Sequence, residues 1–554
     1  MKKTANNILL LCANNQALLS IARSLSKKGF CIDVADWQNL SVKHSRYINN
    51  YYRLSDIELN ADAFVNDLCK LIETNNYLFL LPVNDVALEI CVKYRSTLEG
   101  KISLVASPSD ETYDYSHNKY LLLKKCEELA FSIPAYFYIE NLAVLDKIAK
   151  NIKYPVIAKP VFSKLIKDKK LYQFSVKKIF SENELYDFIR EIILNVPVLL
   201  EEYIEGYGAG YNVLAKEGVI VAAYQHERIT EPIGGGASSY RKTTEINKYG
   251  LKDCSEKLIN SIKWTGPAMI EYRIADGIPY IMEINGRFWG SMELALFTGI
   301  DYPALLIDSL YYNKDLPYKE NNKIVYARNF KMDLRYALLK CIYYKNPLYI
   351  LKFVKSLLHS FRSDEIIEDS LFRDFKLELY NYYSLIGKAF LLIYRKIKPT
   401  FIAFRKDKPV LQKGAKIGFL CYGNICRSPF AEFYAKKHYG SDYSFYSFGS
   451  IKQENRLSPV NAVAAASDFG IDLNLHISKF ISLEQAKNMD VIFIMDKFNY
   501  SRFKKLYPQF IDKVFYLDNK AEIKDPFRGN INIFKNIYKV IAERIDLLFI
   551  NVAK

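Results

Sequence analysis

Short apolar runs alternate with amphipathic stretches near the N-terminus. Apolar runs occupy residues 7–13 and 30–37, and the stretch between them, 15–29, has the apolar spacing of a helix. Two more apolar runs, 78–84 and 101–107, continue the series. Because strands and helices that alternate along a chain form a parallel sheet covered by helices, this pattern predicts an α/β domain.

The same alternation returns in the C-terminal part of the chain. Four strand-like runs occupy residues 416–420, 443–450, 489–495 and 513–518, with helix-like segments between them. They predict a second, doubly wound parallel sheet. Between the two ends, residues 111–310 mix strand-like with helix-like segments.

Residues 311–413 differ from the rest in composition. They hold 21 Lys and Arg against 10 Asp and Glu, a difference of +11 out of a total of +16, and are rich in Tyr and Phe. This mix suits amphipathic helices with a basic face that contacts an anionic membrane or an acidic partner. The alternative is a solvated face on a helical connector. The Lys- and Pro-containing stretch 405–414 predicts a linker.

The chain's 554 residues exceed one ordinary core, since single domains stop growing at about 250–300 residues. Its nine cysteines show no paired spacing except Cys421 and Cys426, which indicates a reducing compartment, and we expect a cytoplasmic protein without a nucleic-acid partner. The first apolar run is short and lacks a cleavage site, which favours a buried strand over a signal peptide. No stretch approaches the roughly 18 apolar residues of a spanning helix.

One strand–helix junction carries chemistry. Residues 421–428 read CYGNICRS, between an apolar run and a helix-like segment. Backbone N–H groups of such a loop converge beside the positive end of the helix dipole and attract an oxyanion. We expect Cys421 to be a thiolate that attacks phosphorus, while the planar fork of Arg427 holds two phosphoryl oxygens.

The leaving oxygen of that reaction needs a proton. Asp525, which is followed by a proline that stiffens the loop, is the candidate acid, and Ser428 can donate a hydrogen bond to the Cys421 sulfur. A buried structural cysteine is the commoner fate of a lone cysteine, but strand, loop, helix and a distant Asp-Pro-aromatic together favour the catalytic interpretation.

The stretch CYGNICRSP resembles the phosphate loop of the low-molecular-weight protein tyrosine phosphatase family, and the resemblance covers 415–554. It implies a phosphotyrosine protein or small aryl phosphate as substrate, a phosphocysteine intermediate and no cofactor. Cys421 corresponds to the nucleophile, Arg427 to the phosphate-binding arginine and Asp525 to the acid. The remaining phosphate-loop residues are Tyr422, Gly423, Asn424, Ile425, Cys426 and Ser428. Phe527 departs from the family, which usually has tyrosine there.

A second candidate site lies in the stretch 268–291, which predicts a β-hairpin with a five-residue loop around Asp276 and Gly277. If Ile274 pairs with Tyr280, then Glu271 lies opposite Glu283. Two facing carboxylates destabilise a sheet unless a cation lies between them, and Asn285 points to the same face as Glu283. Two carboxylates and an amide oxygen suit Mg²⁺; the alternative is a solvated sheet face.

Two lysines and a strand end add to this site. Lys119 opens a helix and Lys159 interrupts an apolar strand, so that both can reach phosphates, although either can also extend out of a core. The stretch 199–206 provides a strand end whose backbone can pair with an adenine edge. Taken together, residues 1–310 resemble the ATP-grasp superfamily, in particular its carbamoyl-phosphate-synthase-like carboxylate–amine ligases.

This resemblance implies ATP and Mg²⁺ (or Mn²⁺) as cofactors and a reaction through an acyl phosphate with unknown carboxylate and amine substrates. It assigns metal binding to Glu271, Glu283 and Asn285, and ATP binding to Lys119, Lys159, Glu201, Glu202, Tyr203, Ile204 and Arg287. One departure is the loop after Lys159, which is glycine-rich in the family and here has no glycine over residues 161–176.

The expected fold is therefore α/β with four parts. A Rossmann-like domain (1–110) precedes an ATP-grasp domain of two α+β subdomains (111–310); a basic helical connector (311–413) and a phosphatase domain (414–554) follow. Two hypotheses stay open for the ATP-grasp half. It either catalyses ligation, as the carboxylate pair favours, or only senses a nucleotide or metabolite and regulates the phosphatase, as the glycine-free loop favours.

Overall fold

The computed structural model describes residues 6–12, 17–321, 323–369, 372–381, 383, 384, 387 and 409–549. The chain divides into two compact units. The first comprises Met1–Phe137, Val161–Lys178 and Glu201–Ile393, and the second comprises Tyr138–Pro160, Ile179–Leu200 and Tyr394–Lys554.

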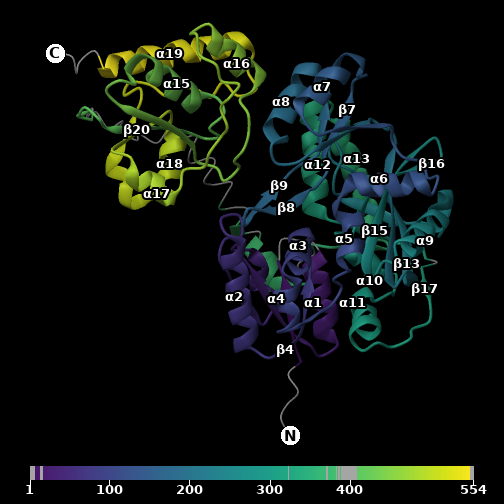
Figure 1. Ribbon diagram of the computed structural model, residues 1–554. Coiled ribbons are helices and arrows are strands. Elements are labelled where there is room, and N and C mark those ends of the chain that lie inside the picture. The colour runs from purple at the N-terminus through teal and green to yellow at the C-terminus, as the bar shows by residue number, and fades with distance from the viewer. Residues whose placement is uncertain are drawn as a thin grey trace. The chain divides into compact units, whose positions relative to one another are not determined.

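A five-stranded parallel sheet forms the N-terminal part of the first unit (Figure 1). Its order is β3-β2-β1-β4-β5. Ile8 and Leu10 of β1 pack into a core with α1, while Leu9 and Leu11 pack into a second core with α2, because alternate side chains of a strand face opposite sides. The predicted parallel α/β domain is confirmed. The elements are β1 (Asn7–Leu11), α1 (Ala17–Lys27), β2 (Cys31–Asp36), β3 (Asn50–Arg53), α2 (Ala61–Thr74), β4 (Tyr77–Pro82), α3 (Asp85–Lys93), α4 (Arg95–Glu99) and β5 (Ser103–Leu104).

A large sheet forms the centre of the first unit, with the order β16-β15-β12-β13-β14-β18-β19 and β17 paired to β13. Tyr211 and Ile270 on its central strands pack against α6 and α9, and both side chains are fully buried. The elements are α5 (Asp110–His117), α6 (Lys119–Glu128), β12 (Tyr207–Lys216), β13 (Val219–Thr230), β14 (Tyr240–Thr243), α9 (Leu251–Ser261), β15 (Gly266–Ala275), β16 (Ile278–Asn285), α10 (Met292–Phe297) and α11 (Tyr302–Leu306).

The segment predicted as a helical connector includes the helices α12 (Phe330–Tyr344) and α13 (Leu348–Ser356), but its described residues are not only helical. It also supplies β17 (Lys319–Glu320), β18 (Tyr326–Arg328) and β19 (Glu365–Ile367) to the large sheet. These strands are two or three residues long, too short for an apolar pattern to be visible in the sequence. Of the helix-like stretch that follows and the predicted linker, residues 388–408 lie outside the described residues.

Arg328 explains why this segment belongs to the sheet. Its guanidinium is fully buried, with Nε donating to Glu365 at 2.9 Å, an ion pair to Asp333, and a bond to Ser356 Oγ at 3.0 Å. It also lies 3.7 Å from the centre of the Tyr240 ring. A buried charge is stable only when it is paired, so this network ties β14, β18, α12 and β19 together.

A four-stranded lobe belongs to the second unit, with the order β10-β7-β11-β6. Its two helices each begin at a residue whose side chain accepts a hydrogen bond from the first turn, Asn141 and Ser181, as capping requires. The elements are β6 (Tyr136–Ile139), α7 (Leu142–Ile148), β7 (Val156–Pro160), β10 (Lys177–Ile179), α8 (Glu182–Ile192) and β11 (Val198–Glu202).

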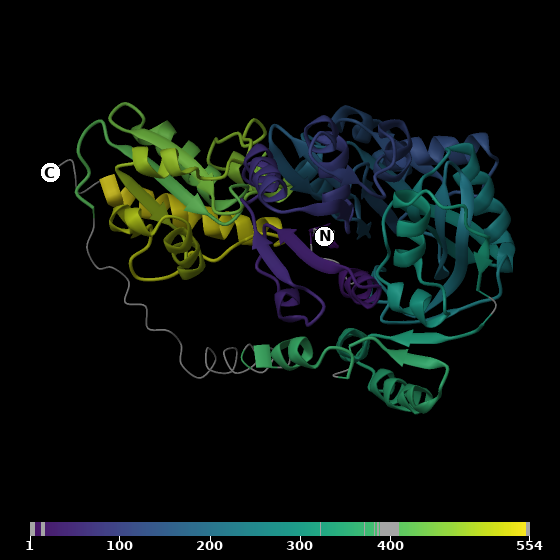
Figure 2. The same ribbon diagram turned by 90° about the horizontal axis from the view of Figure 1, so that it is seen from below.

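The C-terminal domain is a four-stranded parallel sheet of order β21-β20-β22-β23. Ile417 and Phe419 of β20 pack with α15, α16 and α19, and Leu420 faces α17 and α18, so that helices cover both faces (Figures 1 and 2). The predicted doubly wound sheet is confirmed. The elements are β20 (Lys416–Cys421), α15 (Arg427–Tyr439), β21 (Ser444–Gly449), α16 (Val460–Ser467), α17 (Leu483–Asn488), β22 (Val491–Ile494), α18 (Lys497–Leu506), β23 (Val514–Tyr516) and α19 (Ile531–Phe549). Among the described helices, none has the length and apolarity needed to cross a membrane.

Replacing Arg328 by alanine removes the buried guanidinium that Asp333 and Glu365 share, so we expect it to destabilise the first unit by about 3–5 kcal/mol. Urea unfolding followed by tryptophan fluorescence measures this, because Trp37, Trp264 and Trp289 are the chain's three tryptophans and all lie in that unit. Arg362→Ala is the control, since Arg362 pairs with Asp364 at the surface, and it should unfold like the wild type. Equal urea midpoints for Arg328→Ala and the wild type would contradict the assignment.

Candidate functional site

The C-terminal site lies where β20 ends and α15 begins. Cys421 is the last residue of the strand, Arg427 is the first of the helix, and residues 422–426 connect them. This is the strand, loop and helix that the sequence predicts. The carboxyl end of a parallel strand beside a helix N-terminus is where backbone N–H groups converge on an anion.

Two hydrogen-bond donors point at the Cys421 sulfur, which is buried with the residue only 3% exposed. The backbone N–H of Asn424 donates to Sγ at 3.2 Å, and the Ser428 hydroxyl donates at 3.0 Å. Asn424 has a left-handed φ of 54°, and its side-chain amide donates to Ser428 Oγ and Ser447 Oγ at 3.0 and 2.9 Å. Donors in this arrangement stabilise negative charge on sulfur.

The guanidinium of Arg427 lies at the same site and is 1% exposed. One terminal nitrogen donates to Asp496 at 2.6 Å and to the Ile523 carbonyl at 2.9 Å, and the other donates to Asp525 at 2.8 Å. Burial by itself lowers the pKa of Arg427, but the charges of Cys421, Asp525 and Asp496 outweigh it and raise that pKa. A fork held in one orientation suits two phosphoryl oxygens.

Aromatic rings form the exposed rim of this site. Tyr422 is 38% exposed, and its ring lies 5.3 Å from that of Phe498. Phe527 follows Asp525 and Pro526, is 39% exposed, and its N–H donates to the Asp525 carboxylate at 3.2 Å. Rings beside a phosphate-binding loop suit an aromatic leaving group.

The other residues of the phosphate-binding loop contact the domain core or a neighbouring arginine. Ile425 and Cys426 are buried in the domain core, and burial raises the pKa of the Cys426 thiol well above its ordinary value. Gly423 lies against Arg456, since a Cβ at this glycine would be 3.1 Å from an arginine nitrogen. Cys426 is therefore expected to stay a neutral thiol.

In the central site, β15 and β16 pair as an antiparallel hairpin, and Glu271 lies opposite Glu283 as predicted. Two details of the predicted hairpin, the partner of Ile274 and the length of the loop, were wrong. Ile274 pairs with Pro279, not Tyr280, because a β-bulge after Glu271 shifts the register by one residue. The loop has two residues, Asp276 and Gly277, both with positive φ as a type I′ turn requires, and not five.

Nitrogen atoms of two neighbouring side chains lie close to the facing carboxylates. The amide nitrogen of Asn285 lies 3.1 Å from Glu271 and 3.4 Å from Glu283, and Arg228 pairs with Glu271 at 2.6 Å. Burial raises the pKa of Glu271, with Arg228 opposing and Glu283 adding to this effect. Two carboxylates and one amide fit a hard cation, provided that the amide presents its oxygen. Among the residues described here, no group of three or more His, Cys, Asp and Glu adds a further metal candidate.

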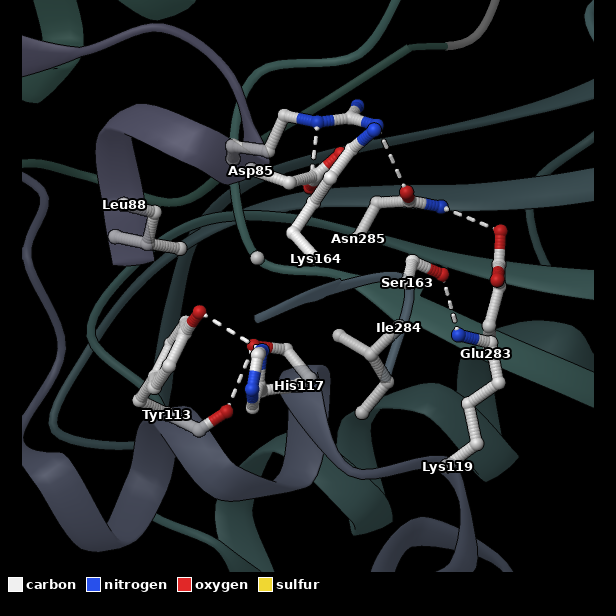
Figure 3. Close-up of a pocket in the computed structure, with 13 residues that line it drawn as sticks. Asp85, Leu88, Tyr113, His117, Lys119, Ser163, Lys164, Glu283, Ile284 and Asn285 are labelled. Atoms are coloured by element: carbon white, nitrogen blue, oxygen red, sulfur yellow. Dashed lines mark hydrogen bonds and ion pairs between the residues drawn. The ribbon is translucent and has the colours of Figure 1, made fainter. Parts of the chain in front are cut away.

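A pocket of about 180 Å³ opens beside Glu283 and Asn285, within the first unit (Figure 3). Lys119 reaches it from the start of α6, and its amine donates to Ser163 Oγ at 2.6 Å. Arg287 binds Asp85 through two nitrogens at 2.9 and 3.2 Å and donates to the Asn285 oxygen at 2.9 Å. The pocket therefore gathers four of the predicted residues: Lys119, Glu283, Asn285 and Arg287.

Four other predicted residues lie at the end of β11, and Lys159 lies in β7. Glu201 is buried and Glu202 accepts a hydrogen bond from the N–H of Ala135 at 3.1 Å. Tyr203 and Ile204 follow the strand, and the Tyr203 ring has the Lys178 amine 3.2 Å from its centre. Lys159 is 8% exposed.

The glycine-free loop after Lys159 is an ordered hairpin. β8 (Lys164–Lys167) and β9 (Lys170–Gln173) pair around a turn of Asp168 and Lys169, both at positive φ. Ile166 and Leu171 are buried in the core beside α2. The hairpin is thus fixed by apolar packing, unlike a glycine-rich loop that is free to close over phosphates.

Two acidic site residues were missed in the sequence. Asp85 follows β4 and Asp496 follows β22, each just beyond the carboxyl end of a parallel strand. That position gathers ligand-binding residues in open α/β sheets, and it is the signal that identifies them.

Comparisons with known proteins find a match in each half of the chain. Residues 416–554 match the family described as low molecular weight phosphotyrosine protein phosphatase, and residues 195–331 match the one described as ATP-grasp in the biosynthetic pathway with Ter operon. The Escherichia coli (strain K12) low molecular weight protein-tyrosine-phosphatase Wzb is 30% identical over 125 residues, which is 22% of this chain and 84% of that protein.

The N-terminal half is similar to longer proteins. The carbamoyl phosphate synthase large chain of Saccharolobus solfataricus is 24% identical over 220 residues, 35% of this chain but only 20% of that protein. The chain thus spans a fifth of that relative's length. A crystal structure of L-amino acid ligase from Bacillus licheniformis has 18% identity and a TM-score of 0.42, covering 56% of this chain and 75% of that one.

Proposed function

Because residues 416–554 belong to the low molecular weight phosphotyrosine protein phosphatase family, we propose that this domain hydrolyses phosphate monoesters through Cys421. The sulfur attacks phosphorus and forms an S–P bond while the P–O bond to the leaving group breaks. Asp525 gives its proton to the leaving oxygen, and water then releases phosphate from the cysteine. The observation that carries this proposal is the pair of donors on the Cys421 sulfur beside the Arg427 fork.

The substrate that fits best is a phosphotyrosine protein or a small aryl phosphate. Tyr422, Phe498 and Phe527 surround the mouth of the site with exposed aromatic surface. An aryl ring can pack between such side chains while its phosphate reaches the loop. Nothing in this chemistry requires a cofactor, because the arginine and the backbone N–H groups supply the positive charge.

For the N-terminal half we propose an ATP-dependent ligase that activates a carboxylate as an acyl phosphate for capture by an amine. Lys119, Lys159 and Arg287 would hold phosphate oxygens, with the segment from Glu201 to Ile204 on the adenine. Mg²⁺ or Mn²⁺ would lie at Glu271, Glu283 and Asn285, where it would neutralise phosphate charge. Glu283, which lines the pocket of Figure 3 and faces Glu271 across the hairpin, supports this reading.

A second candidate function is nucleotide or metabolite sensing without turnover. The observation that favours it is the β8–β9 hairpin, which is anchored in an apolar core and lacks glycine where ATP-grasp ligases use a mobile loop. In this case the N-terminal half would bind ATP and regulate the phosphatase.

The basic helices α12 and α13 support peripheral contact with an anionic membrane surface in the cytoplasm. Leu348, Leu351 and Val354 recur at a spacing of three along α13 and are more than half exposed, as is Ile342 of α12 at 73%. Lysines lie on the same helices, so the surface combines apolar contact with attraction to acidic headgroups.

Removing the nucleophile or the acid separates the two steps of the phosphatase proposal. Cys421→Ser should abolish hydrolysis of para-nitrophenyl phosphate. Asp525→Asn should slow phenyl phosphate hydrolysis by about 10²–10⁴-fold and para-nitrophenyl phosphate by less, since a good leaving group needs less protonation. Asp472→Asn, an exposed surface change, is the control. Steady-state kinetics measure both substrates, and full activity of Cys421→Ser would refute the mechanism.

Glu283→Ala distinguishes ligation from sensing. If the N-terminal half is a ligase, ADP release with mixtures of candidate carboxylates and amines should fall at least about 100-fold in this variant, because the metal loses a carboxylate. Glu245→Ala, an exposed glutamate outside the pocket, should match the wild type. Calorimetric ATP binding by wild-type protein without ADP release from any mixture would instead support the sensor.

Vesicle sedimentation tests the membrane proposal. Wild-type protein should bind phosphatidylserine-containing vesicles in low salt and dissociate at 0.5 M salt, since surface charges are then screened. A double variant, Ile342→Glu with Leu351→Glu, should lose binding, whereas Val219→Glu, at a position 66% exposed outside these helices, should keep it. Equal binding of the double variant and the wild type would remove the proposal.

A further inference from the structure

The peptide between Gly423 and Asn424 connects the nucleophile to a residue outside the phosphate-binding loop. Its N–H, that of Asn424, donates to the Cys421 sulfur at 3.2 Å. Its carbonyl oxygen, that of Gly423, accepts a hydrogen bond from the guanidinium of Arg456. In a planar trans peptide the C=O and N–H point in opposite directions, so a donor on the oxygen fixes the direction of the N–H. Arg456 thus holds one of the two groups that face the sulfur.

Arg456 is buried, and hydrogen bonds fix the backbone of the short loop that carries it. The residue is 5% exposed, its N–H donates to Ser478 Oγ at 3.1 Å, and its carbonyl accepts from the Ser478 N–H at 2.9 Å. The preceding N–H, that of Asn455, donates to the Ser478 carbonyl at 3.0 Å. Residues 455 and 456 are therefore fixed on one side by the C-terminal domain itself.

Helix α8 of the four-stranded lobe holds the other side of this loop, within the same compact unit. The Leu457 N–H donates to the Arg190 carbonyl at 2.9 Å, and the Arg190 side chain donates to the Ser458 carbonyl at 2.8 Å. The Val460 N–H donates to the Asp187 carboxylate at 2.8 Å. Three hydrogen bonds thus join α8 to Leu457, Ser458 and Val460, which follow Arg456 in the chain.

The same helix contacts Arg456 directly. Glu191 lies 3.6 Å from the guanidinium nitrogen that does not bind Gly423. Just after the helix, the Asn195 amide donates to the carbonyls of Glu454 and Asn455 at 3.0 and 3.2 Å. The arginine is therefore held between a carboxylate of the lobe and a carbonyl of the phosphate-binding loop.

We propose that Arg456 is a positioning residue of the phosphate-binding loop and that α8, through Asp187, Arg190 and Glu191, sets its position. The four-stranded lobe would then determine how tightly the C-terminal site binds an oxyanion. Arg456 does not touch the reacting atoms; it orients the Asn424 N–H that does. The inference rests on the proposed phosphatase function for its kinetic consequence, but the binding of phosphate can be measured without turnover.

The test uses full-length protein and two readouts, the Kd of inorganic phosphate by calorimetry and the kcat and KM for para-nitrophenyl phosphate. Arg456→Gln should weaken phosphate binding and lower kcat, each by about tenfold, because one backbone donor is misdirected. Arg456→Lys, which keeps a donor, should recover part of both losses. A variant that is merely misfolded in part would lower the calorimetric stoichiometry and leave Kd unchanged.

The lobe is tested by Asp187→Ala combined with Arg190→Ala, which should raise the phosphate Kd about three- to tenfold, part of the loss expected for Arg456→Gln. Glu182→Ala combined with Asn183→Ala, on the exposed first turn of the same helix, is the matched control and should bind phosphate like the wild type. The role of α8 would be overturned if the Asp187→Ala, Arg190→Ala protein bound phosphate with the wild-type Kd. It would also be overturned if the control variant bound phosphate as weakly as that protein. Wild-type Kd in Arg456→Gln would overturn the role of Arg456.

The failure of this inference and that of the proposed function are distinguishable. Wild-type protein that binds phosphate but hydrolyses no aryl phosphate would refute the function while the Kd series still tests the inference. Active wild-type protein with unchanged Kd in Arg456→Gln would refute only the inference.

Discussion

A cysteine sulfur at the end of β20 accepts hydrogen bonds from one backbone N–H and one serine hydroxyl, and the rest of the C-terminal domain holds those two donors in place. The N–H requires the left-handed backbone at Asn424, and the side chain of that residue in turn binds Ser428, Ser447 and the Lys479 N–H. The contacts with Ser428 and Ser447 are buried, and the contact with the Lys479 N–H is partly buried. Because an unmade buried hydrogen bond is costly, the loop has one stable geometry rather than several.

The central site shows the opposite design, in which like charges face each other across two strands. Glu271 and Glu283 are neighbours in the sheet, and nitrogen atoms from Arg228 and Asn285, together with the charge of Arg287, offset their repulsion. A sheet tolerates such a pair when a positive group is supplied. Exchanging the amide nitrogen of Asn285 for its oxygen would replace a donor that faces the carboxylates by a third oxygen.

Much of the architecture was visible in the sequence because apolar runs in parallel sheets are long and unmistakable. β1, β2, β4, β20 and β22 fall within runs that the pattern identifies. The opposition of Glu271 and Glu283 was also predicted, yet from a pairing of Ile274 that the structure does not contain. A β-bulge after Glu271 shifts the register between that residue and Ile274, and no residue pattern in the sequence indicates this bulge. Short strands such as β18 escaped because their place depends on contacts of Arg328 with residues as distant in the sequence as Tyr240 and Glu365. Arg456 escaped for the same reason: its role depends on contacts that only the folded chain brings together.

The second unit is built from segments that lie far apart in the chain, and this has a consequence for biosynthesis. Its lobe is encoded at 138–160 and 179–200, while the loop that α8 binds lies beyond residue 450. During translation, which adds roughly 5–20 residues per second, α8 is therefore complete well before its partner loop emerges. In that interval the polar groups of Asp187 and Arg190 are satisfied by water, and the lobe must fold on its own contacts. The nascent chain thus passes through a stage in which α8 has been synthesised while its surface for the later loop stays hydrated.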